Sequence, residues 1–288
     1  MDKPAGLTSA AAVGRLRRSS GERRVGHGGT LDPAATGVLP IFFGRATVLA
    51  EFLSAQGKSY CGEVVLGATS STDDGEGELT AVPFDHQPNE PQIAAALATF
   101  VGHIQQAPPA YSAVKIDGER SYKRARRGDQ PAPLARSVHL FSARLAGCRT
   151  GEGGFRMATV EITCGPGFYV RALARDLGRA LGCGGYLGSL RRTSVGPLRV
   201  EEAIGLEDAE AMGPALETRL LPSQLALGSM ISIEVRPEDE GRLAHGMEVE
   251  APVAEAGPAF ARGDGDRLLA IGEVFAGRFR PRRLVEVG

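Results

Sequence analysis

The chain has 288 residues, enough for a large core or two domains, because single hydrophobic cores stop growing at roughly 250–300 residues. Hydrophobic residues make up 42% and charged residues 23%, which excludes disorder throughout and is ordinary for a folded enzyme. The net charge of −1 excludes a uniformly basic surface, so a polyanionic partner would have to meet a local basic patch.

The cysteines are scattered, with no C-x-x-C pair and no histidine at zinc-finger spacing. We therefore expect reduced and mostly buried thiols at Cys61, Cys148, Cys164 and Cys183. The amino terminus lacks the apolar segment of a signal peptide, and no apolar run approaches the roughly 18 residues of a membrane span. These features predict a cytoplasmic protein.

The first half of the chain predicts helices and one long strand. Apolar spacing predicts a helix over residues 9–18, capped by Thr8 or Ser9, and a second over residues 46–54. Residues 58–66 alternate with a period of two, which predicts a strand leading into a polar loop. Asn89 is expected to cap a further helix that stops at Gly102.

Residues 26–39 form a glycine-rich turn that ends in one acidic side chain, Asp32, ahead of an apolar stretch. Glycines in such a loop let a bulky ligand approach the backbone closely. The pair Asp32-Pro33 is typical of a helix start, with the aspartate as N-cap and the proline in the first turn. The alternative is an ionised carboxylate that acts as nucleophile or base. Both roles are compatible, because helix amides would keep the carboxylate charged.

Strands are expected over residues 110–115 and 136–145, and the segment between them is strongly basic. Its cations surround Tyr122 and are Lys115, Arg120, Lys123, Arg124, Arg126 and Arg127. One interpretation is a solvated helix face. The other is contact with RNA, because phosphates attract cations and bases can stack on the aromatic ring.

The last third combines a strand, a glycine turn and a helix with a β-rich tail. Residues 155–163 alternate, and a turn bearing Tyr169 and Arg171 leads into a helix over residues 172–181. We expect this turn to return both side chains to the first glycine loop. Strand-like runs at 231–235, 247–253, 268–274 and 284–287 predict a small β-barrel-like domain. Its tail carries Arg278, Arg280, Arg282 and Arg283.

A series of motifs follows in order from Asp2: Asp2-Lys3-Pro4, residues 26–33 with 37–39, Lys58-Ser59-Tyr60, residues 111–115 and residues 167–171. Together they resemble the bacterial TruB family of tRNA pseudouridine synthases. The resemblance implies an α+β pseudouridine synthase fold, with a long mixed, mostly antiparallel sheet flanked by helices, over residues 1–221. It also implies a small β-rich, PUA-like RNA-binding domain over residues 222–288.

The resemblance implies isomerisation of uridine to pseudouridine at position 55, in the T loop of tRNA. The implied partner is the T-arm stem-loop, with no metal, nucleotide or organic cofactor and no obligatory protein partner, so we expect a monomer. Gly57-Lys58-Ser59 ends like a phosphate-binding loop, but Phe52 stands where that loop needs its first glycine, which excludes a P-loop NTPase.

The resemblance also assigns the reacting groups. Asp32 would open the N-glycosidic bond, either by attack on C1′ of the ribose or by removal of the C2′ proton. Tyr60 would stack on the target base and take or relay the C5 proton. Arg171 would pair with Asp32 and hold it charged; the alternative is an arginine that binds another carboxylate.

The remaining assignments concern substrate binding. The target uridine must be flipped out of its stack, and His27 is similar to the family residue that fills the vacated space. Tyr169 would wall the pocket, or else be a half-buried core residue. The further assignments are support of the cleft by Lys3, packing against the pocket by Leu190, and RNA contact by Lys123, Arg124 and Arg126.

The chain departs from the family pattern at three points. It begins at Met1, so an edge strand is missing or the start lies upstream. Phe168 replaces a small polar residue, and Gly28 stands where Thr or Ala is frequent. Two other functions are considered, a tRNA-folding chaperone and an unrelated RNA-binding module. The set of Asp32, Tyr60 and Arg171 favours catalysis, because a pure binder needs no charged carboxylate in its pocket.

Overall fold

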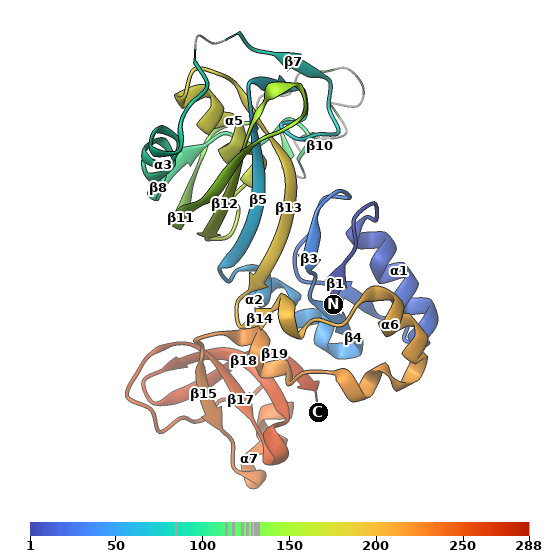
Figure 1. The fold of residues 1–288 in the computed structure, drawn as a ribbon. Helices are drawn as coiled ribbons and strands as arrows, with labels where there is room; N and C mark the ends of the chain where they lie inside the picture. Colours follow the sequence, from blue (N-terminus) through green and yellow to red (C-terminus); the bar gives the residue numbers. More distant parts are fainter. Residues whose placement is uncertain are drawn as a thin grey trace. The chain divides into compact units, whose positions relative to one another are not determined.

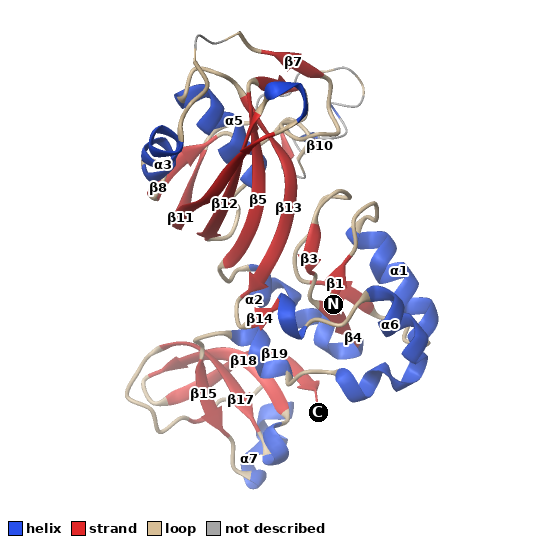
Figure 2. Ribbon diagram, in the orientation of Figure 1, coloured by secondary structure: helices blue, strands red, loops and turns tan. Residues whose placement is uncertain are grey.

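The computed structural model describes residues 1–83, 86–112, 115–116, 119–121, 124, 127, 129 and 133–287. Helices and strands are mixed throughout, as predicted for an α+β protein (Figures 1 and 2). The chain divides into two compact units, each assembled from segments far apart in sequence. The first unit contains Met1–Pro33, Leu39–Gln56 and Gly196–Gly288, and the second contains Ala34–Val38 and Gly57–Val195.

The second unit is built on a sheet that is antiparallel except at one edge. Its strands, in spatial order, are β3 (Thr36–Val38), β13 (Gly185–Val195), β5 (Lys58–Leu66), β12 (Arg156–Cys164), β11 (Arg136–Thr150) and β8 (Gly102–Gln106). Of these pairs, that of β3 with β13 is parallel and the others are antiparallel. The predicted strands over residues 58–66, 136–145 and 155–163 are confirmed as β5, β11 and β12.

Two helices pack on this sheet. Helix α3 (Glu90–Ala98) contacts β11, and α5 (Val170–Ala180) contacts β13 and β5. Asn89 caps α3 as predicted, in a reciprocal capping box with Gln92. Short elements complete the unit: β6 (Ala68–Ser70) pairs with β7 (Leu79–Ala81), β9 (Lys115–Ile116) pairs with β10 (Glu119–Arg120), and η2 spans Glu152–Gly154.

In the first unit, residues 1–33, 39–56 and 196–227 form short helices and strands. Helix α1 (Ser9–Ser20) begins at Thr8, whose side chain accepts a hydrogen bond from the Ala11 amide. Helix α1 packs on α6 (Leu206–Met212), and Arg15 of α1 forms a two-point ion pair with Glu210 of α6. The elements are β1 (Asp2–Lys3), β2 (Val25–His27), β4 (Ile41–Phe43), η1 (Gly44–Leu49), α2 (Ala50–Ser54), β14 (Leu198–Arg199), η3 (Val200–Glu202), α6 (Leu206–Met212), η4 (Gly213–Arg219) and η5 (Ser223–Leu227).

The carboxyl-terminal part of the first unit is a curled sheet with its own core. Its strand order is β15 (Ile231–Glu234), β17 (Gly257–Arg262), β18 (Leu268–Phe275), β19 (Arg278–Val287) and β16 (Val249–Glu250), with helix α7 at Pro237–Ala244. Ile233, Leu243, Ala270 and Phe279 are buried together. The four strands predicted from the sequence are present here, and β17 and α7 are additional.

The helix predicted to start at Asp32-Pro33 is wrong. The chain instead bends at Pro33 and continues into strand β3. The reason lies in Gly37, which has a φ of +102° and passes so close to β13 that a Cβ would lie 2.1 Å from the Arg192 carbonyl oxygen. This extended approach to β13 cannot be made by a helix.

Other boundaries also differ from the predictions. The strand predicted over residues 110–115 is wrong for 110–112, which form bends, and its residues 113 and 114 lie outside the described residues. The helix predicted over residues 46–54 is split into a 3-10 turn and a short α-helix. Strand β13 was not predicted at all.

We predict that Gly37→Ala strongly destabilises the protein. The added methyl group meets backbone rather than a movable side chain, and the positive φ is strained for alanine, so the cost should be about 2 kcal/mol or more. Thermal unfolding measures this. The matched control is Gly147→Ala on β11, where a Cβ meets nothing within 4 Å. Equal melting temperatures for the two variants would contradict the close approach.

Candidate active site

The loop that presents Asp32 is anchored through the backbone on both sides of that residue. Before it, the Ser9 hydroxyl accepts a hydrogen bond from the Leu31 amide at 2.9 Å and donates to the Leu31 carbonyl at 3.0 Å. After it, the Pro33 carbonyl accepts from the Lys3 ammonium at 3.1 Å and from the Gly6 amide at 2.9 Å. The half-buried Asp32 therefore sits in a loop with little freedom to move.

Lys3 is completely buried, and its ammonium group donates hydrogen bonds to backbone carbonyls. Besides Pro33 it donates to the carbonyls of Pro4 and Leu7, both at 2.7 Å. It thus ties the amino terminus of the chain to the Asp32 loop. His27 ends β2 on the other side of the loop, and is half-buried.

In the second unit, Tyr60 is buried beside an arginine that sequence reasoning missed. Tyr60 lies on β5, opposite Arg192 of β13. Arg192 is only 1% exposed, and its Nε donates to the Val38 carbonyl at 2.7 Å. Burial lowers the pKa of Arg192, and a hydrogen bond with the Tyr60 phenol opposes that shift. This arrangement places a cation where it stabilises negative charge on the phenol oxygen.

Lys58 occupies the same face of β5, two residues before Tyr60. It is 9% exposed, and burial together with the charge of Arg192 lowers its pKa to about 8. Cys164 pairs with Lys58 across the strands, and burial raises the pKa of this thiol to about 12. All the cysteines are free; Cys164 and Cys183 are buried as predicted, whereas Cys61 and Cys148 are only half-buried.

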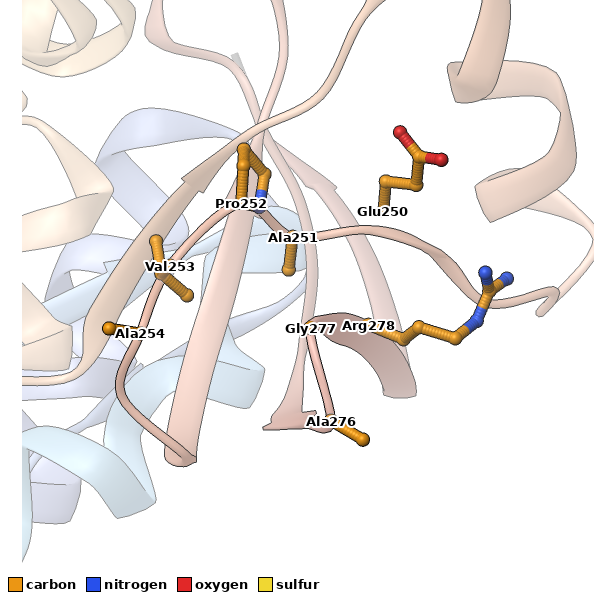
Figure 3. Close-up of a pocket in the computed structure, with 8 residues that line it drawn as sticks. All are labelled: Glu250, Ala251, Pro252, Val253, Ala254, Ala276, Gly277 and Arg278. Atoms are coloured by element: carbon orange, nitrogen blue, oxygen red, sulfur yellow. The ribbon is translucent and has the colours of Figure 1, made fainter.

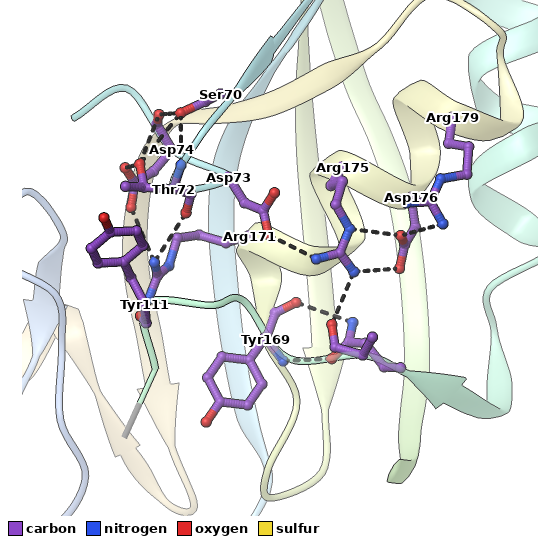
Figure 4. Close-up of polar contacts among 12 residues, drawn as sticks. Ser70, Thr72, Asp73, Asp74, Tyr111, Tyr169, Arg171, Arg175, Asp176 and Arg179 are labelled. Atoms are coloured by element: carbon purple, nitrogen blue, oxygen red, sulfur yellow. Dashed lines mark hydrogen bonds and ion pairs between the residues drawn. The ribbon is translucent and has the colours of Figure 1, made fainter. Parts of the chain in front are cut away.

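Arg171 lies in the first turn of α5 and is 8% exposed. Its guanidinium donates to the carbonyls of Thr72 at 3.2 Å and Tyr111 at 3.0 Å, and forms an ion pair with Asp74 at 3.3 Å (Figure 4). Asp74 comes from the loop between β6 and β7 and was not singled out in the sequence, where it is one acid of a polar turn. The expected pairing of Arg171 with Asp32, which belongs to the first unit, stays a prediction.

Tyr169 and Leu190 also belong to the second unit. The half-buried Tyr169 precedes α5, and its backbone is held by Gln106, which accepts from its amide at 2.8 Å and donates to its carbonyl at 3.1 Å. Leu190 is half-buried on β13, opposite Gly62 of β5. Their roles as pocket walls stay predictions.

The sequence contains two basic segments, residues 115–127 and residues 278–283, and the structure describes the second more fully than the first. In the first, Arg124 is half-buried and lies 3.7 Å from the carboxylate of Asp129, whereas Lys123, Arg126 and Tyr122 lie outside the described residues. In the tail, every one of the predicted cations has an acidic neighbour. Arg278 and Arg280 pair with Glu248, Arg282 pairs with Glu273, and Arg283 pairs with Glu51.

A cavity of about 590 Å³ lies between the ends of β16 and β19 in the first unit (Figure 3). Its only charged lining side chains are Glu250 and Arg278, and the rest of the lining is small or apolar. None of the side chains that the sequence predicts for the site lines this cavity.

Metal binding and membrane crossing find no support in the described part of the chain. The residues that the structure describes hold no group of three or more His, Cys, Asp or Glu side chains placed to bind a metal ion. Among the same residues, no helix has the length and apolar character that a membrane crossing needs.

Two family models match the chain. Residues 17–170 match the N-terminal domain of TruB family pseudouridylate synthase, and residues 171–227 match the C-terminal domain of tRNA pseudouridylate synthase B. The chain is 42% identical to tRNA pseudouridine synthase B of Dinoroseobacter shibae, covering 100% of this chain and 94% of the relative. The corresponding protein of Caulobacter vibrioides is 39% identical, covering 100% of this chain and 95% of the relative.

Solved structures of low sequence identity share the fold. A chain in a Cbf5-Nop10-Gar1 complex aligns with a TM-score of 0.74 at 22% identity, covering 99% of this chain and 84% of that chain. A chain in an archaeal box H/ACA Nop10-Cbf5 complex gives 0.72 at 21% identity, with 99% and 84% covered. These alignments confirm the predicted fold class.

The lowered pKa of Lys58 predicts a pH dependence of stability. An unfolded lysine holds its proton up to its ordinary pKa of 10.5, whereas the folded one loses it near pH 8. Between these values the unfolded state binds more protons, so stability rises with pH relative to the variant Lys58→Met. Melting temperatures of both proteins across the window between these two pKa values measure this, and parallel profiles would contradict the burial of a charged lysine.

Proposed function

The chain belongs to the TruB family of pseudouridylate synthases, and we propose that Asp32 is the carboxylate with which it isomerises uridine to pseudouridine in tRNA. The anchoring of Leu31 and Pro33 on either side of Asp32 is the observation that carries this proposal. A held carboxylate can be aimed at one atom of the ribose without losing side-chain and backbone freedom at the moment of reaction.

The chemistry needs one carboxylate and one proton carrier. The bond from C1′ to N1 of the base breaks, the base turns, and a bond from C1′ to C5 forms. The C5 proton is lost and N1 ends protonated, so the atoms balance without any further reactant. Asp32 would break the first bond, by attack on C1′ or by removing the C2′ proton.

Tyr60 would stack on the base and take or relay the C5 proton. The buried Arg192, hydrogen-bonded to the phenol, supports this role because it stabilises the phenolate that such a relay forms. In the same proposal Arg171 keeps Asp32 charged, Tyr169 and Leu190 wall the pocket, and His27 fills the space left by the flipped base. Flipping costs a few kcal/mol, which contacts to the extruded nucleotide must offset.

Recognition of the tRNA is assigned to both predicted domains. We place the target at position 55 of the T loop, the catalytic part at residues 1–221 and a further RNA-binding part at residues 222–288. The segment with Lys123, Arg124 and Arg126 would contact phosphates. The Cbf5 neighbours are described in complexes with other proteins, whereas we propose that this chain acts as a monomer in the cytoplasm, with no protein partner.

We predict that Asp32→Asn abolishes pseudouridine formation on an unmodified tRNA transcript. The amide has nearly the same shape but cannot attack C1′ or take a proton, so tRNA affinity should stay within about tenfold, or 1.4 kcal/mol. Mass mapping of the transcript after incubation with the protein alone reads out the product and its position. The control is Asp264→Asn, at an exposed turn of the first unit. Turnover by Asp32→Asn at the wild-type rate would remove the proposed role.

Replacing Lys123, Arg124 and Arg126 together by alanine should weaken tRNA binding and flatten its salt dependence. Removing one phosphate interaction reduces the slope of log affinity against log salt by about 0.7 to 0.9. Affinity is measured between roughly 50 and 200 mM salt, the range over which such interactions are screened. Arg179→Ala, at a side chain that is 76% exposed, serves as control. An unchanged slope in the triple variant would show that this segment faces bulk water.

A further inference from the structure

A second arginine of helix α5, Arg175, lies one turn after Arg171 and binds the same loop. Its Nη1 contacts the Asp73 carboxylate at 2.8 Å, and its Nη2 donates to the Ala107 carbonyl at 2.9 Å. The Asp176 carboxylate accepts from the other side of the guanidinium, at 3.0 and 3.2 Å. Successive arginines of α5 therefore meet successive aspartates of one loop (Figure 4).

The loop reaches α5 through an unusual backbone conformation. Asp73 has a φ of +62°, in the left-handed region that residues other than glycine rarely adopt. Consecutive side chains of an extended chain point to opposite faces, whereas here Asp73 and Asp74 both have partners on α5. The left-handed residue is what lets both carboxylates face the same helix.

Other contacts hold the loop at both aspartates. The Asp73 amide donates to the Ser70 carbonyl at 3.2 Å. The Asp74 carboxylate accepts from the Glu76 amide at 3.1 Å and from the Thr72 hydroxyl. The main chain of Leu187 on β13 donates to the Asp73 carbonyl at 3.0 Å. The Asp73 side chain is held by its ion pair with Arg175. The two side chains are 14% and 20% exposed, respectively.

We propose that Arg175 is a positioning residue for the reaction: by binding the Asp73 carboxylate to α5, it keeps the Thr72 carbonyl and the Asp74 carboxylate aimed at Arg171. The inference rests on the proposed catalytic role of Arg171. Arg175 itself touches no reacting atom. Without this ion pair the loop is no longer held to α5 at Asp73, and the two loop groups that orient the Arg171 guanidinium shift.

A purely structural ion pair would behave differently. Its removal would lower the melting temperature but leave the reaction rate of the folded protein unchanged. A positioning pair affects the chemical step, because displacements of about 1 Å at a site can reduce a rate a hundredfold. The rate of the chemical step at saturating tRNA, and not stability, therefore separates the two.

The test compares single-turnover rates of Arg175→Met, Asp73→Asn and the control Arg179→Met with saturating tRNA, below the melting temperature of each variant. Arg179 follows on the same helix, 76% exposed and 3.8 Å from Asp176. We expect about a tenfold loss for Arg175→Met and for Asp73→Asn, tRNA affinity within about twofold, and no loss for the control. Should Arg175→Met fail to fold, Asp73→Asn, which removes the charge of the ion pair and leaves Arg175 and the left-handed turn in place, decides alone.

Coupling to Arg171 is measured with a double-mutant cycle. If Arg175 acts through Arg171, then adding Arg175→Met to Arg171→Lys produces no further loss of rate. Multiplicative losses in the double variant, or wild-type rates in folded Arg175→Met and Asp73→Asn, would overturn the inference. A wild-type rate in Asp32→Asn would instead remove the proposed function, so the two failures are distinguishable.

Discussion

The buried guanidinium of Arg192 is the constraint on which the second unit depends. A charge removed from water is tolerated only when its donors are satisfied, and Arg192 meets this demand with the Val38 carbonyl of β3 and the Tyr60 phenol of β5. One side chain of β13 thereby ties together both neighbouring strands. A shift in the register of these strands would leave the buried charge of Arg192 without these hydrogen bonds. The position of Tyr60 is therefore fixed by electrostatics as well as by packing.

The same region explains why Gly37 and Lys58 have the properties observed. The backbone of β3 approaches β13 so closely that only a glycine fits opposite the Arg192 main chain. Lys58 shares the environment of Arg192, and its pKa is lowered first by its own burial and then by the charge of Arg192. The part of β5 that carries the phenol therefore lies among basic side chains, which suits the proton relay proposed for Tyr60.

Local sequence patterns predicted correctly those helices and strands whose formation depends on residues a few positions apart. The capped helix after Asn89 and the alternating strand of residues 58–66 follow from neighbours within a few positions. Asp32-Pro33 failed as a helix start because β13, far along the chain, imposes an extended path. Strand β13 itself escaped prediction because the partners that accommodate its buried Arg192 lie far away in sequence, among them the Val38 carbonyl, 154 residues before it. Asp74 was missed for the same reason, since its partner lies on α5.

The ion pairs of the carboxyl-terminal tail and those of helix α5 differ in exposure to solvent. The tail arginines are paired with glutamates at positions that are about half exposed, where ion pairs are weak and screened by salt. Phosphates can replace such partners at little cost, so a net charge of −1 is compatible with a polyanionic substrate. The pairs on α5 are several times less exposed. Water competes little for them, and they can therefore hold the geometry of the Arg171 guanidinium, which is what the role proposed for Arg171 requires.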